Sequence, residues 1–409
     1  MTTGTSDCGL KYAVLKSGNA VAYCALGIKC GTRDEEGFHS GIAHFTEHTI
    51  FRGTKKRSAS VINNYLDRLG GDLNAFTNKE EIVIHSTVLK EDLPKAVGLL
   101  MELATSPTFP EDEIETERGV VIDEIISYKD SPSDDVYDRF EEEFFKGHPL
   151  GKPILGTTAS VKKITSEELR KFVAEKFIPS RMVLTVVSPD EEKKTERLVK
   201  RLIDKYFSIS SETATEERIL SLPSNPVFFK KLEKHNHEVN AVIGSSAPSL
   251  YDGKDRISTV LLANILGGPA SNSLLNSELR EKNGWVYGVE CNYTQYADSG
   301  LFTISFGCDR PNLDNCLGAI KRIIKNLREK PLSEAKLKAA KKQLIAQLSV
   351  ASESGEAKCL SMGKSLLAFG KINTDKENRA EIECVTSDDI LKMAGRILAE
   401  DHLSTLIYL

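Results

Sequence analysis

The sequence predicts an α+β fold made of two similar, duplicated domains, each a mostly antiparallel sheet covered by helices. Two observations support this prediction. Short segments typical of strands are mixed with longer segments of helical spacing, without the regular strand–helix rhythm of a parallel sheet. The second half of the 409-residue chain also repeats the pattern of the first, and the chain is long enough for two domains.

Two short echoes support the duplication. Val385–Ile390 (VTSDDI) repeats Ile164–Leu169 (ITSEEL) at an offset of 221 positions, and each copy precedes a helix and then an apolar strand. Asn292–Thr294 (NYT) echoes Ala75–Thr77 (AFT) at an offset of 217 positions. Two matches at nearly the same offset favour an internal duplication over coincidence.

In the first half we expect a hairpin of residues 12–16 and 20–28 around Ser17-Gly18-Asn19. A polar loop then leads into a helix with two histidines, and the next helix begins at Ser60 and ends at Gly70. The remaining expected elements are strands at 72–77 and 82–89, helices at 93–105, 110–128 and 134–145, a helix after the capping box at 165–168, a buried strand at 182–188 and a helix ending near 207.

A segment rich in Ser, Thr, Glu and Pro separates the two halves and has no apolar periodicity. We therefore expect a first domain at 1–207, a linker at 208–226 and a second domain at 227–409. At the offset of the repeat, the second copy reads Val260–Asn264 (VLLAN) where the first carries its two histidines. A site built on those histidines would therefore belong to the first half alone.

Composition argues against several classes of protein. Apolar residues make up 40% of the chain and charged residues 28%, as in ordinary globular proteins, and a net charge of -5 gives no basic excess for nucleic acid. No stretch approaches about eighteen consecutive apolar residues, and the N-terminus does not resemble a secretory signal, so we expect no membrane segment. The 8 scattered cysteines lack a C-x-x-C pair, which is typical of free thiols in the cytoplasm.

The segment His44-Phe45-Thr46-Glu47-His48 carries the strongest chemical signal. Two histidines four residues apart lie on one face of a helix, where two neutral imidazoles can bind one zinc ion. Glu47 then faces the same space and can take a proton from a metal-bound water. The order H-x-x-E-H is the inverzincin signature. The alternative interpretation is a surface helix with two solvated histidines.

A catalytic zinc ion also needs a third protein ligand. The acidic helix expected at 110–128 offers several carboxylates, and Glu117 and Glu124, seven residues apart, share one of its faces. One of the two can bind the metal while the other hydrogen-bonds a metal ligand. The alternative is a solvated acidic face, although Glu124 precedes two isoleucines.

Taken together, these residues resemble the pitrilysin-type (M16) zinc metallopeptidases. The pentapeptide is followed by Phe51-Arg52-Gly53-Thr54, and Glu124 lies 76 residues beyond His48, within the segment Glu117–Ile125. Two further segments match motifs of that family: Gly70–Thr77 and His148–Thr157. The chain length is that of the half-size subfamily, which includes the mitochondrial processing peptidases and bacterial relatives that work as dimers.

The resemblance implies a role for each candidate residue. The roles are zinc ligation for His44, His48 and Glu124, general base catalysis for Glu47, support of the site for Glu117, oxyanion stabilisation for Arg280 and Tyr287, and substrate binding for Asn74, Ala75 and Phe76. Taken alone, the arginine and tyrosine of the second half would be a surface charge and an ordinary strand aromatic.

The function implied by the resemblance is that of a zinc-dependent endopeptidase acting on peptides or unfolded segments bound as an extended strand. A homodimer, or a heterodimer with a related chain, is also implied, because in half-size relatives the arginine–tyrosine pair comes from the facing subunit. The alternative is a non-catalytic partner or scaffold subunit of a processing-peptidase-like complex. Such subunits have usually lost part of the motif, which this chain retains.

Overall fold

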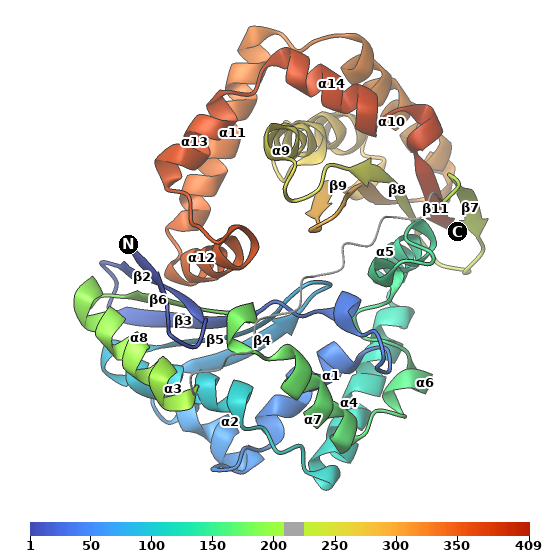
Figure 1. Cartoon of the computed structure of the whole chain (residues 1–409). Coiled ribbons are helices and arrows are strands. Elements are labelled where there is room, and N and C mark those ends of the chain that lie inside the picture. The colour runs from blue at the N-terminus through green and yellow to red at the C-terminus, as the bar shows by residue number, and fades with distance from the viewer. Residues whose placement is uncertain (208–224) are drawn as a thin grey trace. The chain divides into compact units, whose positions relative to one another are not determined.

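The computed structural model describes residues 1–207 and 225–409, so most of the expected linker at 208–226 lies outside the described residues. The chain forms two compact units (Figure 1). Among the described residues, the first unit comprises 1–126, 152–207 and 350–372, and the second comprises 127–151, 225–349 and 373–409. Each unit contains one sheet with helices packed on it, which confirms the predicted fold class.

The sheet of the first unit has the strand order β1-β2-β6-β3-β5-β4. Its strands are β1 (Thr2–Thr5), β2 (Lys11–Lys16), β3 (Val21–Ile28), β4 (Asp72–Thr77), β5 (Ile82–Leu89) and β6 (Met182–Ser188). β2 and β6 are parallel, and the other neighbouring strands are antiparallel. The edge strand β4 alternates between exposed and half-buried residues, as expected for a strand with one face on the core.

The expected hairpin between the first two long strands is wrong, although both strands exist. β6 lies between them, so that Leu184 faces Tyr12 of β2 on one side and Leu26 of β3 on the other. Every residue of β6 is buried, because a predominantly apolar strand is most stable in the middle of a sheet covered on both faces. The turn residues Ser17-Gly18-Asn19 indicate a change of direction but not the pairing partner.

One extensive apolar core covers a face of this sheet, with helices of the first half packed around it. The helices of the first half are α1 (Ile42–Thr49), α2 (Ala59–Asp67), α3 (Leu93–Thr105), α4 (Glu111–Asp130), α5 (Pro132–Phe144), α6 (Thr158–Val161), α7 (Ser166–Lys176) and α8 (Glu192–Tyr206). Its short 3₁₀ turns are η1 (Thr32–Asp34), η2 (Ile50–Arg52), η3 (Lys90–Asp92), η4 (Pro149–Gly151) and η5 (Pro179–Arg181).

Apart from β1, which has no counterpart among the described residues, the second unit repeats the topology of the first with the strand order β7-β11-β8-β10-β9. Its strands are β7 (Phe229–Leu232), β8 (Val239–Ala247), β9 (Val286–Gln295), β10 (Gly300–Cys308) and β11 (Ser404–Tyr408). The parallel pair is again the one that includes the last strand, here β7 with β11. This agreement between the two sheets supports the predicted duplication.

The described residues of the second half also form helices. They are α9 (Gly253–Gly267), α10 (Leu313–Glu329), α11 (Glu334–Ser352), α12 (Gly355–Phe369), α13 (Asp375–Glu383) and α14 (Ser387–Ile397), with the π-helical turn η6 (Asn276–Lys282) and the 3₁₀ turns η7 (Arg310–Asn312) and η8 (Glu400–His402). α9 follows β8 as α1 follows β3, and it carries Val260–Asn264 where α1 carries the two histidines.

The compact units do not coincide with two continuous halves, because one helix of each half packs on the other half's sheet (Figure 1). α5 packs on the sheet of the second unit, with Phe140 in one apolar cluster with Val242. α12 packs on the sheet of the first unit, with Met362 in a cluster with Val183. The predicted domain boundaries at 207 and 227 stay a prediction, since the residues between them are largely outside the described chain.

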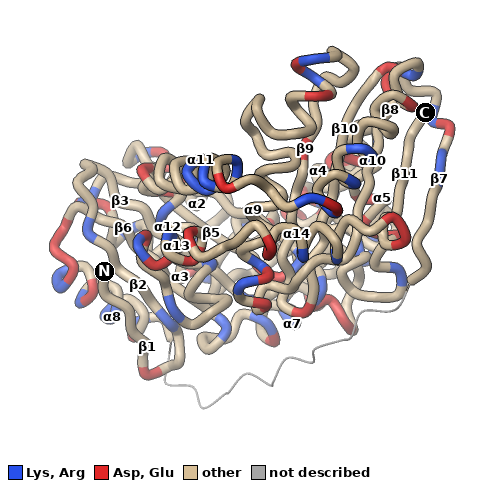
Figure 2. Tube along the Cα trace, turned by 90° about the horizontal axis from the view of Figure 1, so that it is seen from above, with Lys and Arg blue, Asp and Glu red and all other residues tan. Residues whose placement is uncertain are grey.

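Charged side chains are distributed along both units. Lysine, arginine, aspartate and glutamate lie interspersed along the trace in Figure 2. Within the described ranges, no helix is long and apolar enough to cross a membrane.

Candidate metal centre

Helix α1 places both histidines of the pentapeptide on one face. Its apolar side chains, including those of Ile42 and Phe45, are fully buried in the core of the first unit. His44 and His48 follow each other by one helical turn, and their ring centroids are 4.6 Å apart. Their side chains are 8% and 21% exposed, so the solvated-histidine alternative does not apply to this helix.

A buried carboxylate fixes the start of α1. Glu35 is fully buried and accepts hydrogen bonds of 3.1 Å from the backbone N–H groups of Gly41 and Ala43. Burial raises the pKa of Glu35 to about 7, against the opposing effect of these N–H groups. Gly41 has a φ of 90°, and a Cβ there would lie 2.7 Å from the carbonyl oxygen of Leu155. These contacts therefore fix the backbone path that leads into the helix carrying His44.

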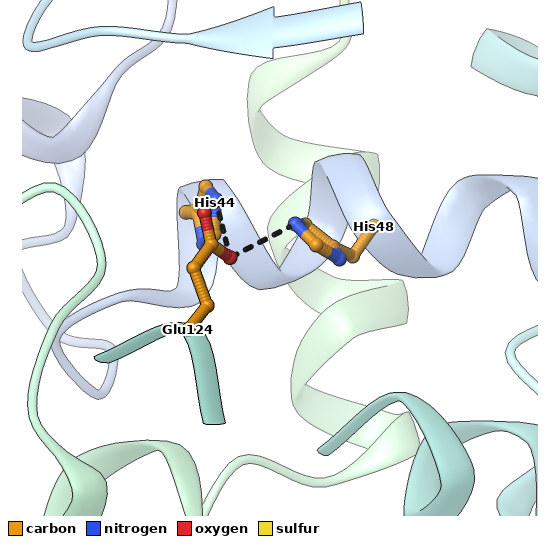
Figure 3. A group of neighbouring side chains, drawn as sticks. All are labelled: His44, His48 and Glu124. Atoms are coloured by element: carbon orange, nitrogen blue, oxygen red, sulfur yellow. Dashed lines mark ion pairs between the residues drawn. The ribbon is translucent and has the colours of Figure 1, made fainter. Parts of the chain in front are cut away.

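The structure brings His44, His48 and Glu124 together (Figure 3). Glu124 comes from α4, and its Oε2 lies 3.7 Å from Nε2 of His44 and 3.5 Å from Nε2 of His48. These three donor atoms lie within 4.8 Å of one another. Ligand atoms around a tetrahedral zinc ion, each about 2.05 Å from it, are about 3.4 Å apart. The donor atoms and their spacing therefore fit one zinc ion.

The environment of the three donors also favours a bound cation. Oε2 of Glu124 is buried and has no hydrogen-bond partner among the described residues, which is costly for a carboxylate oxygen. Burial, together with the neighbouring His48, lowers the pKa of His44 to about 3. His44 is therefore neutral near pH 7, the state in which imidazole binds metal.

Glu117, two turns before Glu124 on α4, contacts the far side of the His48 ring. Its Oε1 lies 2.9 Å from Nδ1 of His48, and its other oxygen forms an ion pair with Arg52 of η2. Burial opposes ionisation, but the hydrogen bond with His48 and the charge of Arg52 lower the pKa of Glu117 below its ordinary value. A carboxylate in this position fixes the orientation of the imidazole.

Glu47 lies between the two histidines in sequence and faces the edge strand. Its Oε2 accepts a hydrogen bond of 2.7 Å from Oγ1 of Thr77, the last residue of β4. Burial raises the pKa of Glu47 above its ordinary value, and a carboxylate with a raised pKa is a better base. The hydrogen bond from Thr77 thus holds one oxygen of the Glu47 carboxylate in place.

The predicted substrate strand is the outer strand of the first sheet. Asn74 and Phe76 are exposed, Ala75 packs against the core, and among the described residues no strand pairs with the outer edge of β4. His85, opposite Asn74 on β5, pairs with Glu356 at 3.1 Å and is not among the three clustered donors.

Arg280 and Tyr287 belong to the second unit. Arg280 is exposed in the π-helical turn η6, and Tyr287 near the start of β9 is 61% exposed. The hydroxyl of Tyr287 donates a hydrogen bond to Oδ1 of Asp309 at 3.1 Å. Both side chains reach the surface of the unit that carries them, and their predicted role stays a prediction.

Sequence reasoning missed three residues that position this centre: Glu35, Arg52 and Thr77. Arg52 and Thr77 lie inside the segments that resemble the M16 peptidases. No spacing rule shows that Arg52 contacts Glu117 or that Thr77 contacts Glu47. Glu35 lies in a polar loop where nothing in the sequence distinguishes it from the neighbouring acids.

Comparison with known families matches most of the chain. Residues 12–158 match the family described as insulinase (peptidase family M16), and residues 163–344 match the family described as peptidase M16 inactive domain. An uncharacterized zinc protease of Rickettsia bellii is 31% identical over 93% of this chain and 90% of its own length. The uncharacterized zinc protease YmxG of Bacillus subtilis is also 31% identical, over 96% of this chain and 95% of its own length.

Solved structures share the fold at lower identity. A protease from Helicobacter pylori superimposes with a TM-score of 0.92 at 22% identity, covering 100% of this chain and 98% of the other. A peptidase M16 inactive domain from Pseudomonas fluorescens superimposes with a TM-score of 0.90 at 18% identity, covering 100% and 97%.

Proposed function

The chain belongs to peptidase family M16, and from that premise we propose that it is a zinc-dependent endopeptidase acting on peptides or unfolded polypeptide segments. The observation that carries the proposal is the convergence of His44, His48 and Glu124 beside Glu47. Three ligands with one carboxylate next to them are the protein groups that a mononuclear zinc hydrolase requires.

In this proposal His44, His48 and Glu124 hold one zinc ion per chain. When bound, the ion would supply a Lewis acid that polarises the scissile carbonyl and lowers the pKa of water. Glu47 acts as the general base: it takes the proton of the attacking water and delivers it to the leaving amine. The hydrogen bond from Thr77 holds the base in place during both transfers.

The substrate binds as an added strand along the outer edge of β4, beside Asn74, Ala75 and Phe76. The open edge of this strand and the link from Thr77 to Glu47 support that placement, since they connect the edge strand directly to the base. Recognition by backbone hydrogen bonds selects extended chains more than particular side chains. Peptides and unfolded segments meet this requirement, and folded proteins do not.

Arg280 and Tyr287 complete the site in this proposal by donating hydrogen bonds to the developing oxyanion from the facing subunit of a homodimer, or of a heterodimer with a related chain. Their exposure supports the proposal. Loss of one such donor typically costs about 10²–10³ in rate. Mixing a Glu47→Gln chain with an Arg280→Ala/Tyr287→Ala chain tests the sharing. Activity should return in mixed dimers, and mixed dimers without activity would refute it.

We also propose a cytoplasmic location. All eight cysteines are free, and seven of them are buried, as is typical of a protein kept in a reducing compartment.

The central test combines metal content with peptide cleavage. The purified chain should retain one zinc ion and cleave a quenched-fluorescence peptide, whereas Glu47→Gln should retain the zinc and lose cleavage. The control variant is Glu36→Gln, which removes an exposed carboxylate from the loop before α1. It should leave both the zinc content and the peptide cleavage unchanged. A chain that holds stoichiometric zinc without any Glu47-dependent cleavage would instead be a non-catalytic partner subunit.

A further inference from the structure

A chain of contacts leads from the surface of the first unit to the metal centre. Arg52 ends the 3₁₀ turn η2 directly after α1, and its guanidinium forms an ion pair with Oε2 of Glu117. The other oxygen of this carboxylate, Oε1, lies 2.9 Å from Nδ1 of His48. On the opposite side of the ring, Nε2 of His48 faces Glu124 at 3.5 Å. Arg52 thus contacts the metal centre through Glu117.

Oε1 of Glu117 is hydrogen-bonded to His48, whereas Oε2 is buried, has no hydrogen-bond partner among the described residues and relies on its ion pair with Arg52. The side chain of Glu117 is only 4% exposed, so water cannot readily replace a partner that is lost, and a buried oxygen left unpaired is costly. A guanidinium is planar and rigid, and it holds a carboxylate in a defined orientation. The ion pair with Arg52 thus helps to orient the carboxylate that is hydrogen-bonded to His48.

The arginine of α4 itself, Arg118, forms its contacts with other groups. Arg118 follows Glu117 directly, but its guanidinium binds Glu115 and the carbonyl oxygens of Val161 and Ile164. Arg52 instead faces the side of α4 that carries Glu117.

A second contact places Arg52 along that side of α4. Its Nη1 lies 4.0 Å from Oε2 of Glu113, one turn before Glu117. Arg52 therefore connects the end of α1 to α4, and these are the two helices that supply His44, His48 and Glu124. Loss of the guanidinium would loosen both the carboxylate and the link between the helices.

We propose that Arg52 is a positioning residue of the metal centre: it orients Glu117, which in turn orients the imidazole of His48 toward Glu124. The inference rests on the metal site of the proposed function but not on peptide hydrolysis. Its consequence is a change in metal affinity, because partners that orient a ligand typically affect affinity by about 10–100-fold.

The test is the zinc dissociation constant of the full chain at one fixed pH, measured by competition with a chromophoric chelator. Arg52→Met should weaken zinc binding about tenfold. The zinc affinity of Arg52→Lys should fall between those of the native chain and Arg52→Met, because an ammonium keeps the charge but not the planar geometry. Arg68→Met removes an exposed arginine at the end of α2 and should leave the affinity unchanged.

A double-mutant cycle then shows whether Arg52 acts through Glu117. The combined Arg52→Met/Glu117→Ala chain should bind zinc no more weakly than Glu117→Ala alone, since the second change removes the group through which the first acts. The proposal would be overturned if the affinity losses of the two single variants multiplied in the combined chain. It would also be overturned if Arg52→Met bound zinc with an affinity within twofold of the native chain. Far-UV circular dichroism monitors folding, and if Arg52→Met does not fold, Arg52→Lys replaces it in the cycle.

This result is independent of the peptidase assay. A chain that binds zinc with the expected dependence on Arg52 but cleaves no peptide refutes the proposed function and leaves the inference standing. A chain that cleaves peptides through Glu47, with a zinc affinity indifferent to Arg52, does the reverse.

Discussion

Glu35 should give the first unit a defined dependence of stability on pH. Its carboxyl group is fully buried and has a pKa of about 7 in the folded chain, against an ordinary value of 4.5. Between these two pH values the folded state holds more protons than the unfolded state, so the free energy of unfolding falls as the pH rises. The stabilisation from the tightly held proton is complete below about pH 4.5 and is lost as the pH passes 7.

The difference between the two pKa values corresponds to roughly 3 kcal/mol, of which about 2 to 3 kcal/mol falls between pH 5 and pH 8. Lys79 and Lys152 are the cations that act on Glu35, and they lower its pKa less than burial raises it. The neutral amide of Glu35→Gln has nearly the same shape and no proton to lose. Relative to this variant, the native chain should therefore lose about 2 to 3 kcal/mol of stability across that range.

The assay is urea unfolding followed by far-UV circular dichroism, with a chelator present throughout so that metal binding does not contribute. The only tryptophan, Trp285, lies in the second unit, so its fluorescence would not report on α1. Glu36→Gln is the matched control and should run parallel to the native chain, because Glu36 is exposed. A difference between the native chain and Glu35→Gln that stays constant from pH 5 to pH 8 would refute the reasoning.

Three further predictions concern packing, backbone and metal. Met362→Ala should destabilise the first unit by about 2–5 kcal/mol in urea unfolding, because the side chain is 1% exposed between α12 and the sheet, whereas Lys364→Ala on the exposed side of α12 should cost less than about 0.5 kcal/mol. Gly41→Ala should lower both the thermal midpoint and the zinc affinity, since its positive φ and the nearby Leu155 carbonyl exclude a Cβ; native values for both would contradict this. Free zinc at about 100 times its dissociation constant should stabilise the native chain by about 2.7 kcal/mol, an effect that a chelator reverses and that should be absent in His44→Ala.

The sequence predicted those parts of the molecule that depend on local pattern. The strand at Met182–Ser188 and the helix at Leu93–Thr105 have the predicted bounds, because a short, mostly apolar run and an amphipathic run each determine their own structure. The grouping of His44, His48 and Glu124 was also predicted. The helical spacing placed the two histidines on one face, but it left Glu117 and Glu124 as alternatives, and the resemblance to the M16 peptidases singled out Glu124.

Pairing and contact partners were not predictable in the same way. The position of β6 between β2 and β3 depends on which strand gains most from burial on both faces, and a turn sequence does not report this. The contacts of Thr77 with Glu47 and of Arg52 with Glu117 join elements far apart in the chain. They follow only from tertiary packing.

The exchange of α5 and α12 has a consequence for biosynthesis. A ribosome delivers the first sheet long before α12, so the surface that Met362 later covers, including Ala25, stays open until more than 350 residues have been translated. The sheet of the nascent first half therefore keeps an exposed apolar face until the second half is made, and this face is open to aggregation and to chaperones. A chain that ends at residue 207 would keep this face uncovered permanently, because it lacks α12, even though it carries every proposed zinc ligand.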